Sequence, residues 1–400
     1  MVLLHPARLA LAIATLALIT FGPVLVARGA SDPSQPGPTG QTPSWSVNLH
    51  TLGFGLDEER PSTLFGNRSP YLQSRFDDHA IAFTSTGQVG LIFWTFSTTS
   101  SGGYVPGTGT TYLISIDGAT GKVIATKQWP WRPDQSGATS ITATPSGKFL
   151  LQGDSQLFLY SPSLQLINSV QLGERVEGHY PSFSYAVSTD GHYVFVQTKK
   201  NNTYTVSMLN SETLQPIRTS PSDFPIAAIS EHYFARWQEL KDVYRRSLYV
   251  QSKGTEWKEI YHDTGCNEVA GSANFLTDTV LLVRSCDKLT VMDIDGNVLF
   301  SNTAMSQQEL GAFGASSDGQ RFAVSIAELK KQPWWFGDPG YDRVHSNMIL
   351  YDVARHQAVS TFTLYQDYER PFRFALSEDG SQLALLRIGV LELYRIKGKD

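Results

Sequence analysis

One four-residue turn returns along this chain, each time between two short runs of alternating apolar residues. Each copy begins with serine or threonine and ends with glycine. The five copies are Thr84-Ser85-Thr86-Gly87, Thr144-Pro145-Ser146-Gly147, Ser188-Thr189-Asp190-Gly191, Ser316-Ser317-Asp318-Gly319 and Ser377-Glu378-Asp379-Gly380. Self-similar units of four strands, spaced roughly 40 to 60 residues apart, are typical of a β-propeller. The repeat therefore predicts the architecture before any single residue suggests a chemistry.

Seven such units can be counted along the chain. Six complete units fit between residues 79 and 364, the first with strands expected at 79–84, 89–96, 111–116 and 122–128. The seventh begins near Phe372 and has only three strands, whereas residues 45–52 alternate like a strand and belong to no unit. Because an unpaired sheet edge favours aggregation, we predict an all-β, seven-bladed β-propeller of four-stranded antiparallel blades. The N-terminal strand is expected to close the ring by joining the last blade.

These units resemble the repeats of WD40-like and YVTN-type propeller proteins over residues 44–396. Ser377-Glu378-Asp379-Gly380-Ser381-Gln382-Leu383-Ala384 is similar to the SPDG-x-x-LA turn of that superfamily, and Met348-Ile349-Leu350-Tyr351-Asp352 is similar to its third strand. The Trp-Asp dipeptide of true WD40 units is absent, which favours the bacterial type. Residues 116–124 also resemble a quinoprotein repeat, but Ala125 stands where that family has its docking tryptophan. The resemblance implies the fold and leaves the function open.

The N-terminal segment indicates export. His5 and Arg8 precede an uncharged apolar run over residues 9–27, and Ala27-Arg28-Gly29 offers a cleavage site of the kind found in secretory signals. We interpret residues 1–29 as a signal peptide, although the run is also long enough to stay as a membrane anchor. Both interpretations place the remaining chain outside the cytoplasm, secreted or periplasmic. Residues 30–43 have the composition of a flexible linker, which leaves 44–396 as a single propeller domain.

Two cysteines, Cys266 and Cys286, flank an expected hairpin whose register brings them close together across the ladder. Export favours oxidation, so we predict a disulfide between them; two unpaired thiols are the alternative. The formal net charge of −5 provides no basic face for nucleic acid. We expect a monomer that touches a membrane only through its N-terminal segment, if that segment is kept.

The connections between strands differ between the two faces of such a ring. Turns from the first strand to the second and from the third to the fourth share one face, and these are short. The opposite face receives long segments at 97–110, 129–137, 173–181, 327–345 and 365–371. Long loops on a rigid scaffold commonly carry binding residues, and aromatic side chains with arginine are typical of interfaces. The candidate binding residues are Trp131, Arg132, His179, Trp335, Arg343, Tyr368 and Arg370.

Signals for catalysis are weak. The histidines show no metal-ligand spacing, and neither a Gly-x-Ser-x-Gly nucleophile motif nor a Cys-x-x-Cys-His haem motif occurs. We predict no metal and no cofactor. The leading interpretation is a non-enzymatic, exported protein that binds a protein, a peptide or a glycan through the loop-rich face. Two other functions stay open: a lactonase-like hydrolase with carboxylates and histidine at the channel mouth, and a membrane-tethered assembly scaffold. The aromatic run at 334–336 has its own alternative, which is to cap the channel or cover a blade instead of contacting a ligand.

Overall fold

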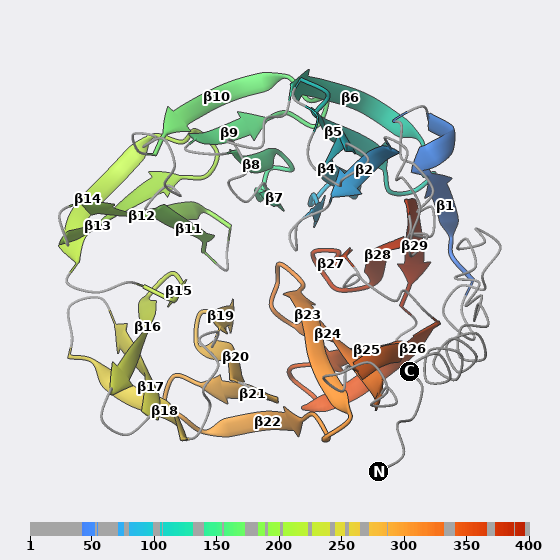
Figure 1. The fold of residues 1–400 in the computed structure, drawn as a ribbon. Coiled ribbons are helices and arrows are strands. Elements are labelled where there is room, and N and C mark those ends of the chain that lie inside the picture. Colours follow the sequence, from blue (N-terminus) through green and yellow to red (C-terminus); the bar gives the residue numbers. More distant parts are fainter. Residues whose placement is uncertain are drawn as a thin grey trace, which may run out of the picture.

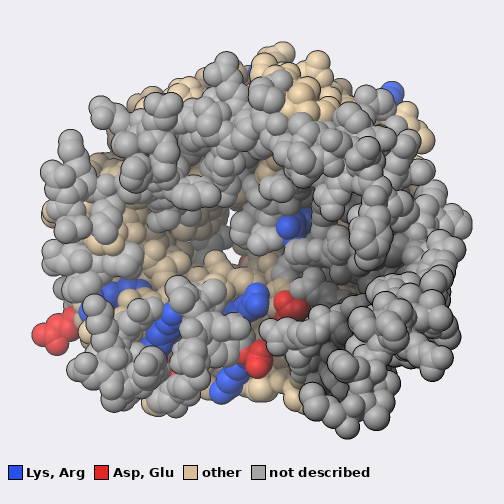
Figure 2. Space-filling view, in the orientation of Figure 1, with Lys and Arg blue, Asp and Glu red and all other residues tan. Residues whose placement is uncertain are grey.

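The chain forms seven antiparallel sheets arranged as a ring around a narrow central opening (Figures 1 and 2). The computed structural model describes residues 42–52, 54, 71–75, 80–98, 105, 107–130, 140–153, 156–172, 183–188, 191–200, 203–222, 226–240, 245–252, 256–264, 272–285, 287–331, 341–365, 373–387 and 389–396. The predicted seven-bladed β-propeller is confirmed. In each blade we name the strands A to D from the channel outward.

Blades 1 to 4 follow one another in sequence. Blade 1 contains β2 (Tyr71–Arg75), β3 (Ile81–Phe83), β4 (Gln88–Thr98), β5 (Thr110–Asp117) and β6 (Val123–Pro130). Blade 2 contains β7 (Ser140–Ala143), β8 (Phe149–Gly153), β9 (Gln156–Tyr160) and β10 (Leu166–Gln171). Blade 3 contains β11 (Phe183–Val187), β12 (Tyr193–Lys200), β13 (Thr203–Asn210) and β14 (Pro216–Ser222). Blade 4 contains β15 (Ala228–Ile229), β16 (Tyr233–Leu240), β17 (Arg245–Ser252) and β18 (Lys258–Thr264).

The remaining three blades complete the ring. Blade 5 contains β19 (Ser272–Thr277), β20 (Val280–Ser285), β21 (Lys288–Asp293) and β22 (Val298–Thr303). Blade 6 contains β23 (Gln308–Ala315), β24 (Arg321–Lys331), β25 (Tyr341–Asp352) and β26 (Gln357–Tyr365). Blade 7 contains β27 (Arg373–Leu376), β28 (Gln382–Arg387), β29 (Val390–Arg395) and, as its outer strand, β1 (Trp45–Asn48).

The predicted ring closure is present. β1 pairs antiparallel with β29, with Trp45 opposite Leu393 and Asn48 opposite Val390. The strand is shorter than the expected 45–52, because β29 begins at Val390 and offers no partner beyond Asn48. The chain turns instead into the 3-10 helix η1 (Leu49–Leu52), which places Leu49, fully buried, in the core of the neighbouring blades.

Blade 1 has a fifth strand that the sequence pattern did not predict. β2 pairs with the end of the 11-residue β4, with Tyr71 opposite Thr98, whereas β3 pairs with its beginning, with Ile81 opposite Leu91. Two separate segments therefore share the inner edge of one long strand.

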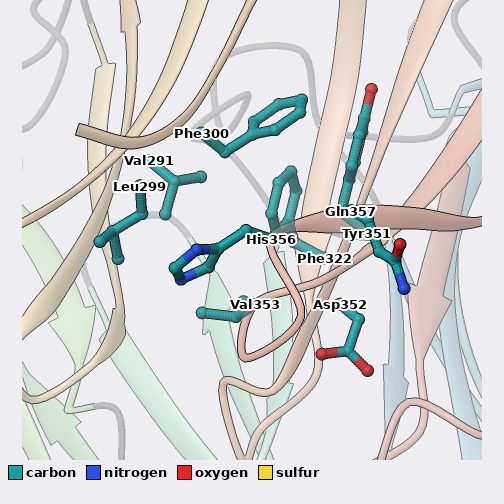
Figure 3. Close-up of a pocket in the computed structure, with 9 residues that line it drawn as sticks. All are labelled: Val291, Leu299, Phe300, Phe322, Tyr351, Asp352, Val353, His356 and Gln357. Atoms are coloured by element: carbon teal, nitrogen blue, oxygen red, sulfur yellow. The ribbon is translucent and has the colours of Figure 1, made fainter.

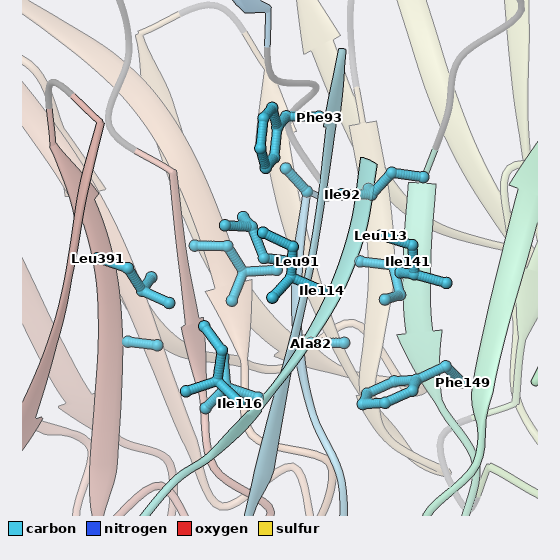
Figure 4. Packing of buried hydrophobic residues seen from close by; sticks show 14 of the residues in the cluster. Ala82, Leu91, Ile92, Phe93, Leu113, Ile114, Ile116, Ile141, Phe149 and Leu391 are labelled. Carbon is cyan, nitrogen blue, oxygen red and sulfur yellow. The ribbon is translucent and has the colours of Figure 1, made fainter. Parts of the chain in front are cut away.

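The core consists of apolar side chains packed between adjacent blades, as Figure 4 shows around blade 1. At Gly90 in β4, a Cβ atom would come within 2.5 Å of the Phe149 ring of blade 2. Glycine therefore allows the two sheets to approach closely here. Each fully buried leucine or isoleucine in this layer contributes about 2 kcal/mol.

Several predicted features lie outside the described residues. These are the N-terminal segment and most of the linker, residues 1–41, and the two cysteines, Cys266 and Cys286. Within the described part of the chain, none of the helices has the length and apolar character needed to cross a membrane.

Candidate functional site

Strand direction assigns every connection to one of two faces. We call the side of the A–B and C–D turns the turn face and the side of the B–C and D–A connections the loop face. In blade 6 the turn face carries the A–B turn between Ala315 and Arg321. At the loop face, β24 ends at Lys331 and β25 begins at Tyr341. The direction of each strand therefore fixes the face on which its end lies.

The turn-face repeats are closed by their own side chains. Ser316 Oγ donates to Asp318 Oδ1 (2.6 Å) and accepts from the Arg321 backbone nitrogen (3.0 Å). Gly319 adopts a φ of +68°, and a Cβ atom there would lie 1.7 Å from the Leu276 carbonyl oxygen of blade 5. The final glycine of the motif thus serves both the turn and the approach of the neighbouring blade.

A partly buried carboxylate joins the turns of blades 2 and 3. Glu212 accepts a hydrogen bond from the Ser146 backbone nitrogen (2.9 Å) and another from the Ser146 hydroxyl, and it pairs with Lys148 Nζ at 2.9 Å. Burial by itself would raise the pKa of Glu212, but the hydrogen bonds from Ser146 and Lys148 outweigh it and lower the pKa to about 2. This carboxylate stays ionised at neutral pH and holds two blades together.

Polar contacts join the turn-face ends of other neighbouring blades in the same way. They are His232 Nδ1 with Asp278 Oδ2 (2.8 Å, blades 4 and 5), Arg321 Nη1 donating to the Gly380 carbonyl (3.0 Å, blades 6 and 7), and Trp45 Nε1 donating to the Gly118 carbonyl (2.8 Å, blades 7 and 1). These groups serve the scaffold, so they are poor candidates for ligand contact.

The loop face is uneven, because one hairpin extends beyond its neighbour. β24 has 11 residues and β28 has 6, although both start two residues after the glycine of their A–B turn. The difference of five residues corresponds to about 17 Å of extended strand. On the longer hairpin, Glu328 Oε2 lies 3.3 Å from His345 Nε2, with the side chains 42% and 26% exposed.

Charged side chains of the described residues gather over blades 4 to 6, beside the central opening (Figure 2). Polar groups at the loop-face ends of these blades also join adjacent sheets. Arg284 donates to the carbonyl oxygens of Leu310 (2.7 Å) and Gly311 (3.1 Å) across blades 5 and 6, and Ser285 Oγ donates to Asp263 Oδ2 across blades 4 and 5.

The predicted binding residues fall almost entirely outside the described part of the chain. Six of the seven lie there: Trp131, Arg132, His179, Trp335, Tyr368 and Arg370. Arg343 lies in β25 opposite Leu329 of β24, and its side chain is not described. The strands that lead to these positions end on the loop face of blades 1, 2 and 6. The proposed grouping of the seven side chains thus stays a prediction.

Sequence reasoning missed an aromatic niche between blades 5 and 6 (Figure 3). Tyr351 stacks on Phe322 at 4.9 Å between ring centres and contacts Phe300 at 4.4 Å, while His356 and Gln357 stand at the rim. The niche has a cavity volume of about 10 Å³, room for roughly one water molecule and far below the range of about 300–1,000 Å³ for small-molecule sites. No local signal links these aromatics, because they come from three strands of two blades.

Among the residues that the structure describes, no three His, Cys, Asp or Glu side chains come close enough together to hold a metal ion.

No protein-family model matches the chain, and no curated protein is significantly similar to it in sequence. Three solved structures are similar in shape. A chain of a mitotic checkpoint complex is 10% identical with a TM-score of 0.48, covering 85% of this chain and 96% of that chain. The Dos1 propeller is 10% identical with a TM-score of 0.42, covering 84% and 96%. Hsv2 of Kluyvelomyces marxianus is 13% identical with a TM-score of 0.39, covering 63% and 70%. Because all three TM-scores are below 0.5, the assignment of the propeller fold rests on the seven sheets of this chain alone.

Proposed function

We propose that this chain is an exported, non-catalytic binding protein that captures a protein, a peptide or a glycan through its loop face. A closed ring of blades is a rigid platform, and connections that extend from such a platform are free to vary for recognition. The aromatic and arginine residues predicted to serve as anchors are Trp335, Tyr368 and Arg370.

The observation that carries this proposal is the use of polar groups on the turn face. There, Glu212, Asp278 and Arg321 each contact the adjacent blade. A substitution that adapted one of these side chains to a ligand would remove a contact between blades and weaken the ring. On the loop face, Arg284 and Asp263 also join adjacent blades, whereas Glu328 and His345 contact each other on a hairpin that extends beyond the next blade.

The test begins with the full exported chain, which is screened against a peptide display library and a glycan array. The Kd of the tightest ligand is then measured for the double variant Trp335→Ala/Tyr368→Ala. We expect the Kd to rise about tenfold or more, the size of effect typical of interface anchors. The melting temperature should change little, because these residues are expected to lie on loops.

The matched control is Asp379→Ala on the turn face. Asp379 accepts hydrogen bonds from Ser377 Oγ (2.7 Å) and from the Ser381 backbone nitrogen (3.0 Å), so its loss should reduce stability and leave the Kd unchanged. If the control abolishes binding and the double variant does not, the functional face is the turn face. If neither library yields a ligand for the parent chain, the proposed binding function is wrong.

A further inference from the structure

The outer edge of blade 6 is a long strand at the end of its sheet. β26 has nine residues and lies on the rim of the ring (Figure 1). It contains no charged residue and no proline. Proteins usually guard an edge strand with such residues, because its unpaired main-chain groups can pair with another chain. A bulge near the start of β26 leaves the stretch from Ser360 to Tyr365 as a regular, unguarded edge.

The register shows which main-chain groups of this edge point away from the sheet. The Ser316 backbone nitrogen donates to the Arg321 carbonyl (2.8 Å), so the main-chain groups of Arg321 face β23. This direction alternates from one residue of a strand to the next. Carried through the pairing of β24, β25 and β26, the alternation makes Leu350 and Ser360 face each other. Three residues of β26 therefore direct their N–H and C=O groups outward: Thr361, Thr363 and Tyr365.

A side-chain contact supports this direction. Thr363 Oγ1 donates to Asn347 Oδ1 across the ladder (2.9 Å). The side chains of opposite residues lie closer together when their main-chain groups face away from each other. Phe362, between the two threonines, is buried in the apolar cluster that joins blades 6 and 7. The edge is thus held in the extended form before any ligand arrives.

The equivalent positions of the other blades are blocked or missing. The outer strands of blades 1 to 5 have the same bulge, which aligns them with β26. In blade 1 the outward positions are Thr126, Gln128 and Pro130, so the third has no N–H. In blade 3 the second position is Pro221. β10, β18 and β22 end before a third position, and β1 has only four residues. Among the outer strands that the structure describes, β26 alone thus presents three successive outward N–H donors.

This edge determines the chemistry of its ligand, because an extended main chain offers carbonyl groups at the matching spacing. Thr361 is exposed, and its side chain lies on the same face of the sheet as that of Thr363. Threonine pairs well with threonine or serine of an adjacent strand, and β26 carries no charge that would attract a charged ligand. We propose that β26 binds an uncharged, extended segment of a partner protein as a fifth strand of blade 6.

This site lies on the rim, so it is separate from the loop-face proposal. The probe is a fluorescent synthetic peptide of alternating threonine and valine, with a lysine at each end for solubility. Its binding to the full chain is followed by fluorescence anisotropy. The test variant is Thr361→Pro, which removes an outward N–H and no ladder bond within blade 6. The matched control is Thr126→Pro, because Thr126 is an exposed threonine at the equivalent position of blade 1.

We expect the peptide to bind the parent chain saturably. Thr361→Pro should raise the Kd at least about tenfold, because the proline ring removes one donor and occupies the space of the added strand. Thr126→Pro should leave the Kd unchanged. N-methylation of the two central peptide residues, which removes one donor from each edge of the peptide, should abolish binding.

The absence of saturable binding, or an equal Kd for the two proline variants, would overturn the proposal. A parent chain that dimerises and becomes a monomer on Thr361→Pro, as measured by light scattering, would assign the edge to a second copy and overturn it too. If Thr361→Pro does not fold, hydrogen exchange of the parent decides: the peptide should slow exchange in residues 360–365 and leave residues 125–130 unchanged, and any other pattern would refute the site.

Discussion

Acid should release the contact between blades 2 and 3 at one identifiable carboxylate. Glu212 receives hydrogen bonds from Ser146 and pairs with Lys148 at 2.9 Å. The substitution Glu212→Gln keeps the shape of the side chain and removes its charge at every pH. The amide has no negative charge to pair with Lys148. Its NH₂ group also cannot accept a hydrogen bond, as the carboxylate oxygen at that position does.

The pKa of Glu212 sets the size and the sign of the effect. A fall of the pKa from 4.5 to about 2 on folding corresponds to about 3 kcal/mol of folding free energy. The side chain is 23% exposed, so solvent screening lowers the expected value to about 1–2 kcal/mol. Because the folded pKa is the lower one, this stability is present above pH 4.5 and is lost as the pH falls from 4.5 toward 2.

Urea unfolding followed by tryptophan fluorescence measures the free energy of unfolding of both proteins. At pH 7 the variant should be less stable by about 1–2 kcal/mol, and by about pH 3 the difference should shrink by roughly half. The control is Glu378→Gln, which changes an exposed carboxylate in the A–B turn of blade 7. A difference that is absent at pH 7, or that stays constant down to pH 3, would refute the assigned role of Glu212.

Two further predictions concern the closure of the fold. Deleting residues 44–52 should lower the melting temperature strongly, because the deletion removes β1 and the fully buried Leu49. Deleting residues 30–43 should leave the melting temperature unchanged. If both truncated proteins melt like the parent, closure by β1 is wrong. Mass spectrometry of unreduced peptides from exported protein should find Cys266 linked to Cys286. Reduction of this disulfide should lower the free energy of unfolding by about 2 kcal/mol. Recovery of two alkylated thiols would reject the bridge.

The sequence determined the blades because their signals are local. A turn such as Ser316-Ser317-Asp318-Gly319 is closed by its own side chains, and alternation along each strand fixes which residues face a neighbouring blade. The strand missing from the last blade likewise predicted pairing by β1. The end of β1 at Asn48 depended on where β29 begins, about 340 residues away, so no pattern around residue 48 could predict it.

Only the tertiary structure decided which polar residues meet between blades. Ser146 and Glu212 are 66 residues apart, and each looks like an ordinary turn residue in its own segment. Local hydrogen bonding and side-chain alternation are encoded within a few residues. Contacts between blades depend on how sheets twist and pack around the ring, which fixes distances between side chains that the sequence alone does not relate.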